Sequence, residues 1–135
     1  MHSTNYSNTL IEIAEDCPAK AGEIPPIKNK KSVANLQYEL LVDQPYQFTS
    51  DEVLFSVFAT REAIAEEDLE AQKTQFFSKG QACFRASPLT KRYGWGVHAD
   101  QTGKIALLGA DSDTYQALKA DPSVQKKKAM RSKRV

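Results

Sequence analysis

Apolar and polar residues alternate in a strand-like pattern at three places along the chain. Residues 9–15, TLIEIAE, form a short, partly alternating run that ends just before a proline, which favours a strand. Residues 93–99 and 104–109 are two further strand-like runs, and the four residues between them end in Gly103, which suits the left-handed position of a bulged turn. The pattern predicts an antiparallel hairpin over residues 93–109 that shares a sheet with the first strand.

Two helices are predicted between these strands from apolar spacing and capping residues. Ser32 is placed to cap a helix that cannot continue past Pro45. Thr49 and Glu52 form a capping box, in which the threonine oxygen accepts from the amide three residues later and the glutamate reaches back. The letters VLFSVF that follow also fit a strand, and the capping box favours the helix.

Further helices are predicted on either side of the hairpin. Residues 65–78 have helical spacing, with Gly80 placed as a left-handed terminator. Asp111 or Ser112 caps the segment DTYQALKA, and Pro122 is suited to begin another helix. The predicted fold class is α+β, in which a small antiparallel sheet packs against four or five helices that lie mainly on one face.

Length and composition limit the organisation of the protein. A chain of 135 residues with 41% hydrophobic and 26% charged residues is typical of one folded domain, here residues 1–135. No apolar stretch approaches the roughly 20 residues needed to cross a bilayer, and the N-terminus lacks the basic and apolar regions of a secretion signal. We therefore expect a cytoplasmic protein with no membrane partner. The oligomeric state is open.

The net charge of +1 hides a strong polarity along the chain. Seven basic residues against one acid give residues 119–135 a charge of +6, which leaves −5 for residues 1–118. A basic C-terminal segment, residues 122–135, is suited to bind nucleic acid or another polyanion through counterion release. Alternatively it is a solubilising extension, or it docks on the acidic helix near residues 62–70. The basic residues of the segment are Lys126, Lys127, Lys128, Arg131, Lys133 and Arg134.

A second basic group surrounds the hairpin, where no acid lies between residues 79 and 98. Arg85, Lys91 and Arg92 are candidates for binding a phosphate or carboxylate, because arginine offers a two-pronged donor. His98 adds a donor that titrates near neutral pH. The alternative is a solvated basic edge without a ligand.

Two glycines in the first hairpin strand leave one face of it without side chains. Alternation places Gly94 and Gly96 on the same face as His98. Either a helix or a ligand approaches the backbone there, or the glycines are tolerated at a bend of the strand. If the occupant is a ligand, His98 is a candidate general acid or base beside Arg92. The candidate pocket-forming residues are Tyr93, Gly94, Trp95 and Gly96.

No metal or cofactor is predicted. Cys17 and Cys83 are expected to be thiols in a reducing compartment. Together with His2 and His98 they lack the short spacing that marks a zinc site, although spacing alone leaves a site built from these four residues open.

Several sequence blocks carry a family resemblance. They include HSTNY at residues 2–6, SPLTKRYGWGVH at residues 87–98 and KAMRSKR at residues 128–134. The chain resembles a family of small, uncharacterised bacterial proteins that is known only as a domain of unknown function. The resemblance implies a cytosolic bacterial protein of one domain, and it supplies no reaction, ligand or catalytic residue.

Three functional hypotheses remain from the sequence. The leading one is a non-enzymatic domain that recognises an anion or a partner, such as a phosphate-bearing ligand, a nucleotide or nucleic acid. The second is a small-molecule enzyme that uses His98, and the third is a structural or interaction protein with no ligand.

Overall fold

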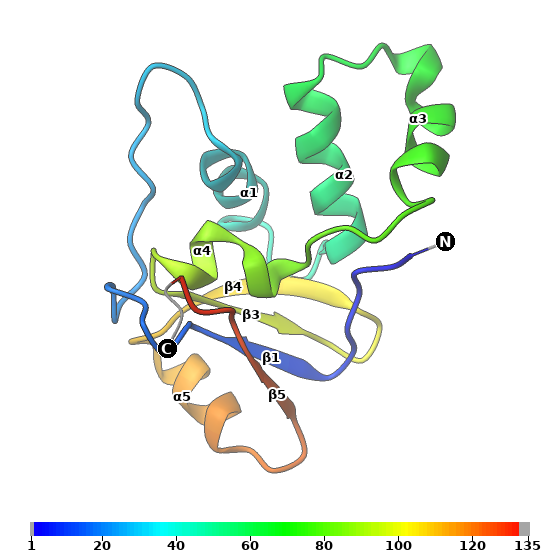
Figure 1. The fold of residues 1–135 in the computed structure, drawn as a ribbon. Helices are drawn as coiled ribbons and strands as arrows, with labels where there is room; N and C mark the ends of the chain where they lie inside the picture. Colours follow the sequence, from blue (N-terminus) through cyan, green and yellow to red (C-terminus); the bar gives the residue numbers. More distant parts are fainter. Residues whose placement is uncertain (1, 133–135) are drawn as a thin grey trace.

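The computed structural model describes residues 2–132, which form five strands and five α-helices (Figure 1). The strands make one mixed sheet in the order β2-β4-β3-β1-β5. The predicted α+β fold class is confirmed, and the elements form a single domain. The strands are β1 Thr9–Glu12, β2 Phe48–Thr49, β3 Trp95–Ala99, β4 Lys104–Gly109 and β5 Gln125–Lys128. The helices are α1 Val33–Leu41, α2 Ser50–Arg61, α3 Leu69–Phe76, α4 Pro88–Lys91 and α5 Asp113–Ala120, with short 3-10 helices η1 Glu66–Asp68 and η2 Phe84–Ala86.

The predicted hairpin and the first strand are both present. β3 and β4 pair antiparallel, and Gly103 in the turn between them has a φ of 87°. β1 pairs antiparallel with β3, with Leu10 opposite His98. The sheet is not wholly antiparallel, however, because β5 joins β1 in parallel. Strand β5 replaces the helix that Pro122 was expected to begin.

Local capping rules predict the helix starts correctly. The side chain of Ser32 accepts from the amide of Asn35, the box of Thr49 and Glu52 forms as expected, and Ser112 caps α5. The role expected of Gly80 is wrong. The glycines with positive φ in the described part of the chain are Gly94 and Gly103, and α3 ends at Phe76 without a left-handed residue.

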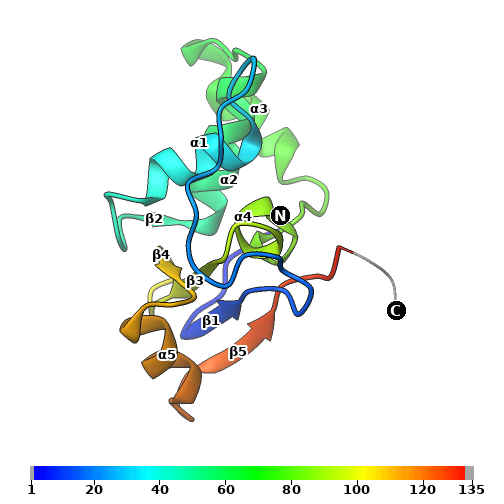
Figure 2. The same ribbon diagram turned by 90° about the vertical axis from the view of Figure 1, so that its left-hand side faces the viewer.

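Helices cover both faces of the sheet, with most of them on one (Figure 2). On the larger side, α1 and α2 pack on the sheet through a core that contains Leu41, Val53 and Val97. On the other side, α5 packs through Tyr115 against Leu10. Within residues 2–132, no helix combines the length and the apolar character needed to cross a membrane.

Candidate functional site

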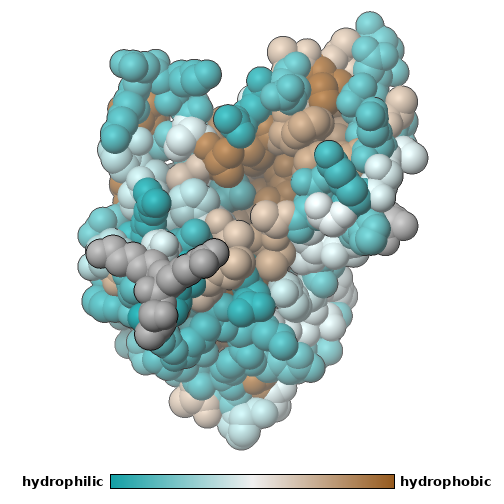
Figure 3. Space-filling model, viewed as in Figure 1, coloured by the Kyte–Doolittle hydropathy of each residue, from teal (hydrophilic) through white to brown (hydrophobic). Residues whose placement is uncertain are grey.

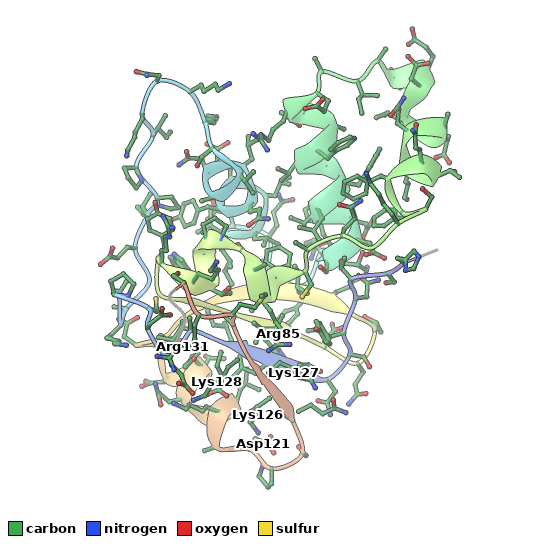
Figure 4. All side chains as sticks on the ribbon, in the orientation of Figure 1. Arg85, Asp121, Lys126, Lys127, Lys128 and Arg131 are labelled. Atoms are coloured by element: carbon green, nitrogen blue, oxygen red, sulfur yellow. The ribbon has the colours of Figure 1, made fainter. Side chains whose placement is uncertain are left out.

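The basic C-terminal segment is part of the sheet, because its lysines form β5 along the edge of β1 (Figure 4). The ammonium of Lys126 donates to the backbone carbonyls of Asp121 and Val124. Lys128 and Arg131 each lie 3.1 Å from a carboxylate oxygen of Glu15. Three basic side chains of this segment are therefore held within the chain, two of them by the single charge of Glu15.

The partner of the segment differs from the acidic helix considered above. Helix α3 lies across the molecule from β5 (Figure 1). For the segment up to residue 132, docking on that helix is therefore wrong, and hydrogen bonding to β1 with pairing to Glu15 takes its place. The side chain of Lys127 is exposed, and its ammonium has no partner within residues 2–132. Lys133 and Arg134 lie outside the described residues.

Arg85 bonds to backbone groups at the C-terminal end of β5. Its Nε donates to the carbonyl of Lys128 at 2.7 Å, and its own carbonyl accepts from the amide of Met130 at 2.7 Å (Figure 4). An uncovered edge strand offers unpaired backbone groups to other chains, and this contact satisfies two of them. The guanidinium that was a candidate anion ligand thus has a structural partner.

The four candidate anion ligands do not form one group. Lys91 is the last residue of α4 and Arg92 is its exposed C-cap, before β3 begins. His98 lies near the other end of β3 and contacts Tyr46. Within residues 2–132 the structure records no contact between His98 and Arg85, Lys91 or Arg92. These positions share a stretch of sequence and do not share a site.

His98 is half-buried and hydrogen-bonded to Tyr46, with the phenol oxygen 2.7 Å from Nδ1. Burial raises the pKa of Tyr46, so the phenol keeps its proton and donates it to Nδ1. Burial also lowers the pKa of His98, against the opposing effect of Asp100. The imidazole is therefore neutral at pH 7, with its proton on Nε2.

This histidine makes stability depend on pH in a known direction. Because the pKa of His98 lies below its ordinary 6.5 in the folded protein, the unfolded chain binds the proton more readily. The contribution of His98 to the free energy of unfolding is expected to be fully present above pH 6.5. It should be lost as the pH falls toward the lower pKa of the folded protein. Urea titrations from pH 8 to 5 measure this loss, and His98→Gln should remove that part of it. An unchanged pH profile in the variant would contradict the assignment.

The glycine face of β3 is filled by the protein itself. A Cβ at Gly96 would lie 2.3 Å from the Tyr115 ring of α5, and a Cβ at Gly94 would lie 2.1 Å from the Ala21 carbonyl oxygen. The packed helix is thus the occupant at Gly96, and these two glycines do not floor a pocket. Tyr93 and Trp95 hold the loop before α1, each through a hydrogen bond to the backbone of Glu23.

An apolar cleft lies between α1 and α2. Figure 3 shows it as a brown recess, and its volume is about 330 Å³. Helix α1 forms one wall, α2 with Phe76 of α3 forms the other, and η2 with the start of α4 forms the floor. Its apolar walls include Val33, Leu54, Val57 and Phe58.

A buried glutamine brings hydrogen-bond donors to this cleft. Gln37 is 3% exposed, and its carbonyl oxygen accepts from the hydroxyl of Ser87 at 2.6 Å. Its amide nitrogen makes no hydrogen bond within residues 2–132. Because no enclosed side-chain nitrogen or oxygen in that range lacks a partner, this nitrogen is open to the cleft. Among residues 2–132, Arg61 is the one charged residue that lines the cleft.

None of the predicted site residues that the structure describes lines this cleft, although one feature of the sequence indicated it. Val33, Gln37 and Leu41 recur every four residues on the inward face of α1, so a polar side chain occupies a core position. A buried polar group is expected to have partners, and this one has an unused pair of donors.

Metal ligands do not gather among residues 2–132, where no group of three histidine, cysteine or acidic side chains is arranged to hold an ion. Cys17 is buried and Cys83 is half-buried, and both are free thiols. Cys83 lies on the cleft, with its sulfur 3.7 Å from the hydroxyl of Tyr6.

The fold and the cleft define a small α+β domain with a mixed five-stranded sheet and an apolar recess between two helices. The chain belongs to a family of unknown function, DUF6157, whose model matches residues 1–135. No curated protein and no solved structure matches the chain.

Proposed function

We propose that this protein is a non-enzymatic binding domain whose ligand is a small anion with an apolar body, held in the cleft between α1 and α2. The observation that carries the proposal is the unpaired amide nitrogen of Gln37 in an otherwise apolar recess. Ligand sites are typically apolar hollows of about 300–1,000 Å³ with a few polar groups that fix orientation. The cleft has this character.

The charge of the cleft favours an anion. In the described part of the chain, its lining contains Arg61 and no acidic residue, and the Gln37 amide offers two N–H donors to a carboxylate or carbonyl oxygen. An apolar chain packs along Leu54, Val57 and Phe58, where it removes apolar surface from water. A carboxylate with an aliphatic chain fits the charge of Arg61, the donors of Gln37 and the apolar wall.

The phosphate and nucleic-acid versions of the hypothesis have less support. Lys126, Lys128, Arg131 and Arg85 have partners in the chain. A nucleic-acid surface requires basic groups free to approach phosphates.

We place the protein in the bacterial cytoplasm, where a reducing environment keeps its two cysteines as thiols.

Calorimetry with decanoate and its methyl ester tests this function. Decanoate is expected to bind with a stoichiometry of one, and Arg61→Gln to weaken it about threefold, as for an exposed ion pair. The uncharged ester should bind wild type and Arg61→Gln equally. Ala86→Phe, which places a ring in the cleft, should abolish both.

Arg92→Gln is the matched control, because Arg92 is also an exposed arginine and does not line the cleft. Its affinity for decanoate should equal that of wild type. Equal losses in both arginine variants would mean that only net charge matters. Binding that survives Ala86→Phe would place the ligand elsewhere.

A further inference from the structure

A second cleft lies on the opposite side of the sheet, where the end of β1 meets α5 and β5. It has a volume of about 310 Å³ and is lined largely by polar side chains. Its charged residues have both signs, in contrast to the cleft between α1 and α2. They are Glu12, Glu15, Lys20, Lys119 and Lys128.

Glu12 is the unusual member of this group. It is 7% exposed, yet its carboxylate accepts no hydrogen bond within residues 2–132. The nearest cation is the ammonium of Lys119 at 3.7 Å, beyond hydrogen-bond distance, on a side chain that is 53% exposed. Lys128 is its register partner on β5 but turns to Glu15 instead. No enclosed side-chain oxygen of residues 2–132 lacks a hydrogen-bond partner, so the unbonded carboxylate oxygens of Glu12 are open to the cleft, where a ligand can donate to them.

Another buried carboxylate in the same molecule provides the comparison. Asp51 is 6% exposed and accepts from the amide and hydroxyl of Thr4 and from the hydroxyl of Ser3, at 2.7 to 2.8 Å. The chain thus satisfies a buried acid where the acid has only a structural role. Glu12 has no such set of donors and faces the cleft.

The surroundings of Glu12 supply groups for the rest of a ligand. The hydroxyl of Tyr115 accepts from the amide of Ile13 at 3.1 Å, and its own hydrogen has no acceptor among the residues the structure describes. Lys20 is exposed, lines the cleft and has no partner in the same part of the chain. The site therefore offers a carboxylate for a cation, and an ammonium and a phenol for an anion.

We infer that this cleft binds a small zwitterion, a free α-amino acid, with its ammonium on Glu12 and its carboxylate toward Lys20 and Tyr115. The ligand's ammonium donates to the carboxylate of Glu12, which has no other donor. The ligand's carboxylate accepts from the other two groups. The site is distinct from the apolar cleft proposed above, and each stands without the other.

Calorimetric titration of the full chain with each proteinogenic L-amino acid tests the inference, with propylamine and propionate as probes that carry one charge. At least one amino acid is expected to bind, and the single-charge probes to bind at least about tenfold more weakly. Glu12→Gln should weaken the amino acid by about tenfold or more, because the charge-assisted bond is lost. Failure of every amino acid to bind, or equal binding of propylamine, would overturn the inference.

Glu15→Gln is the matched control, since Glu15 borders the same cleft but is already paired with Lys128 and Arg131. Its affinity should stay within about twofold of wild type. The melting temperature separates a ligand role from a structural one. Glu12→Gln should melt at or above wild type, because the buried charge is removed. A clear fall in melting temperature would show that Glu12 serves the Lys119 pair, and the inference would fail.

Discussion

Replacing Gly94 with alanine is expected to destabilise the protein by about 2 to 4 kcal/mol. Gly94 has a φ of 76°, a conformation that strains any residue with a Cβ. The added Cβ would also lie 2.1 Å from the carbonyl oxygen of Ala21, and backbone cannot move aside as a flexible side chain does. Urea denaturation followed by circular dichroism measures the loss.

Gly80→Ala is the control for this substitution. Gly80 has no positive φ, and a Cβ there would meet nothing within 4 Å. Alanine at Gly80 should leave stability within about 1 kcal/mol of wild type or raise it, because it restricts the unfolded chain. If both variants unfold at the same urea concentration, the close contact between Gly94 and Ala21 does not exist.

Asp51→Ala is expected to cost about 2 to 4 kcal/mol, because it removes the acceptor of two buried donors, the amide and the hydroxyl of Thr4. The carboxylate accepts from Thr4 and Ser3, and the Asp51 amide donates to the side chain of Asn5 at 2.9 Å. These bonds attach the N-terminal segment to the first turn of α2. The acid also favours the positive end of that helix.

Hydrogen exchange locates the effect of this substitution. The amide of Thr4 should lose its protection in Asp51→Ala, and urea denaturation should show the lower stability of the whole chain. Asp43→Ala is the control, because Asp43 is exposed and has no partner within residues 2–132. A variant at Asp51 that keeps both wild-type stability and protection of Thr4 would contradict the proposed attachment.

Local features of the fold were predictable because their causes are local in sequence. Ser32 and the box of Thr49 and Glu52 act over three residues, and Gly103 acts within one turn. Strand β5 has no local cause: its letters, QKKK, have neither a high β-propensity nor an apolar face. It is a strand because β1, more than 110 residues earlier in the chain, offers it a free edge.

The candidate site could be predicted only where its residues depend on local sequence. Arg85, Lys91, Arg92 and His98 are close in sequence, and the predicted cluster assumed that they are close in space. Strand β3 carries His98 away from the other three, which all precede the strand. The apolar cleft joins α1, α2 and the η2 region, so its assembly depends on helix packing that no spacing in the sequence reports. In the sequence, the cleft is indicated by Gln37, a polar residue at a core position of α1.

A titration of ¹⁵N-labelled protein with decanoate, followed through its side-chain amide signals, tests the assignment of the cleft most directly. The side-chain NH₂ signals of Gln37 should shift and saturate together with the backbone signals of Val57 and Arg61, which face Gln37 across the cleft. The backbone signals of Lys126, Lys127 and Lys128 should stay in place. Shifts confined to those lysines, with the Gln37 signals unmoved, would contradict the cleft as the binding site.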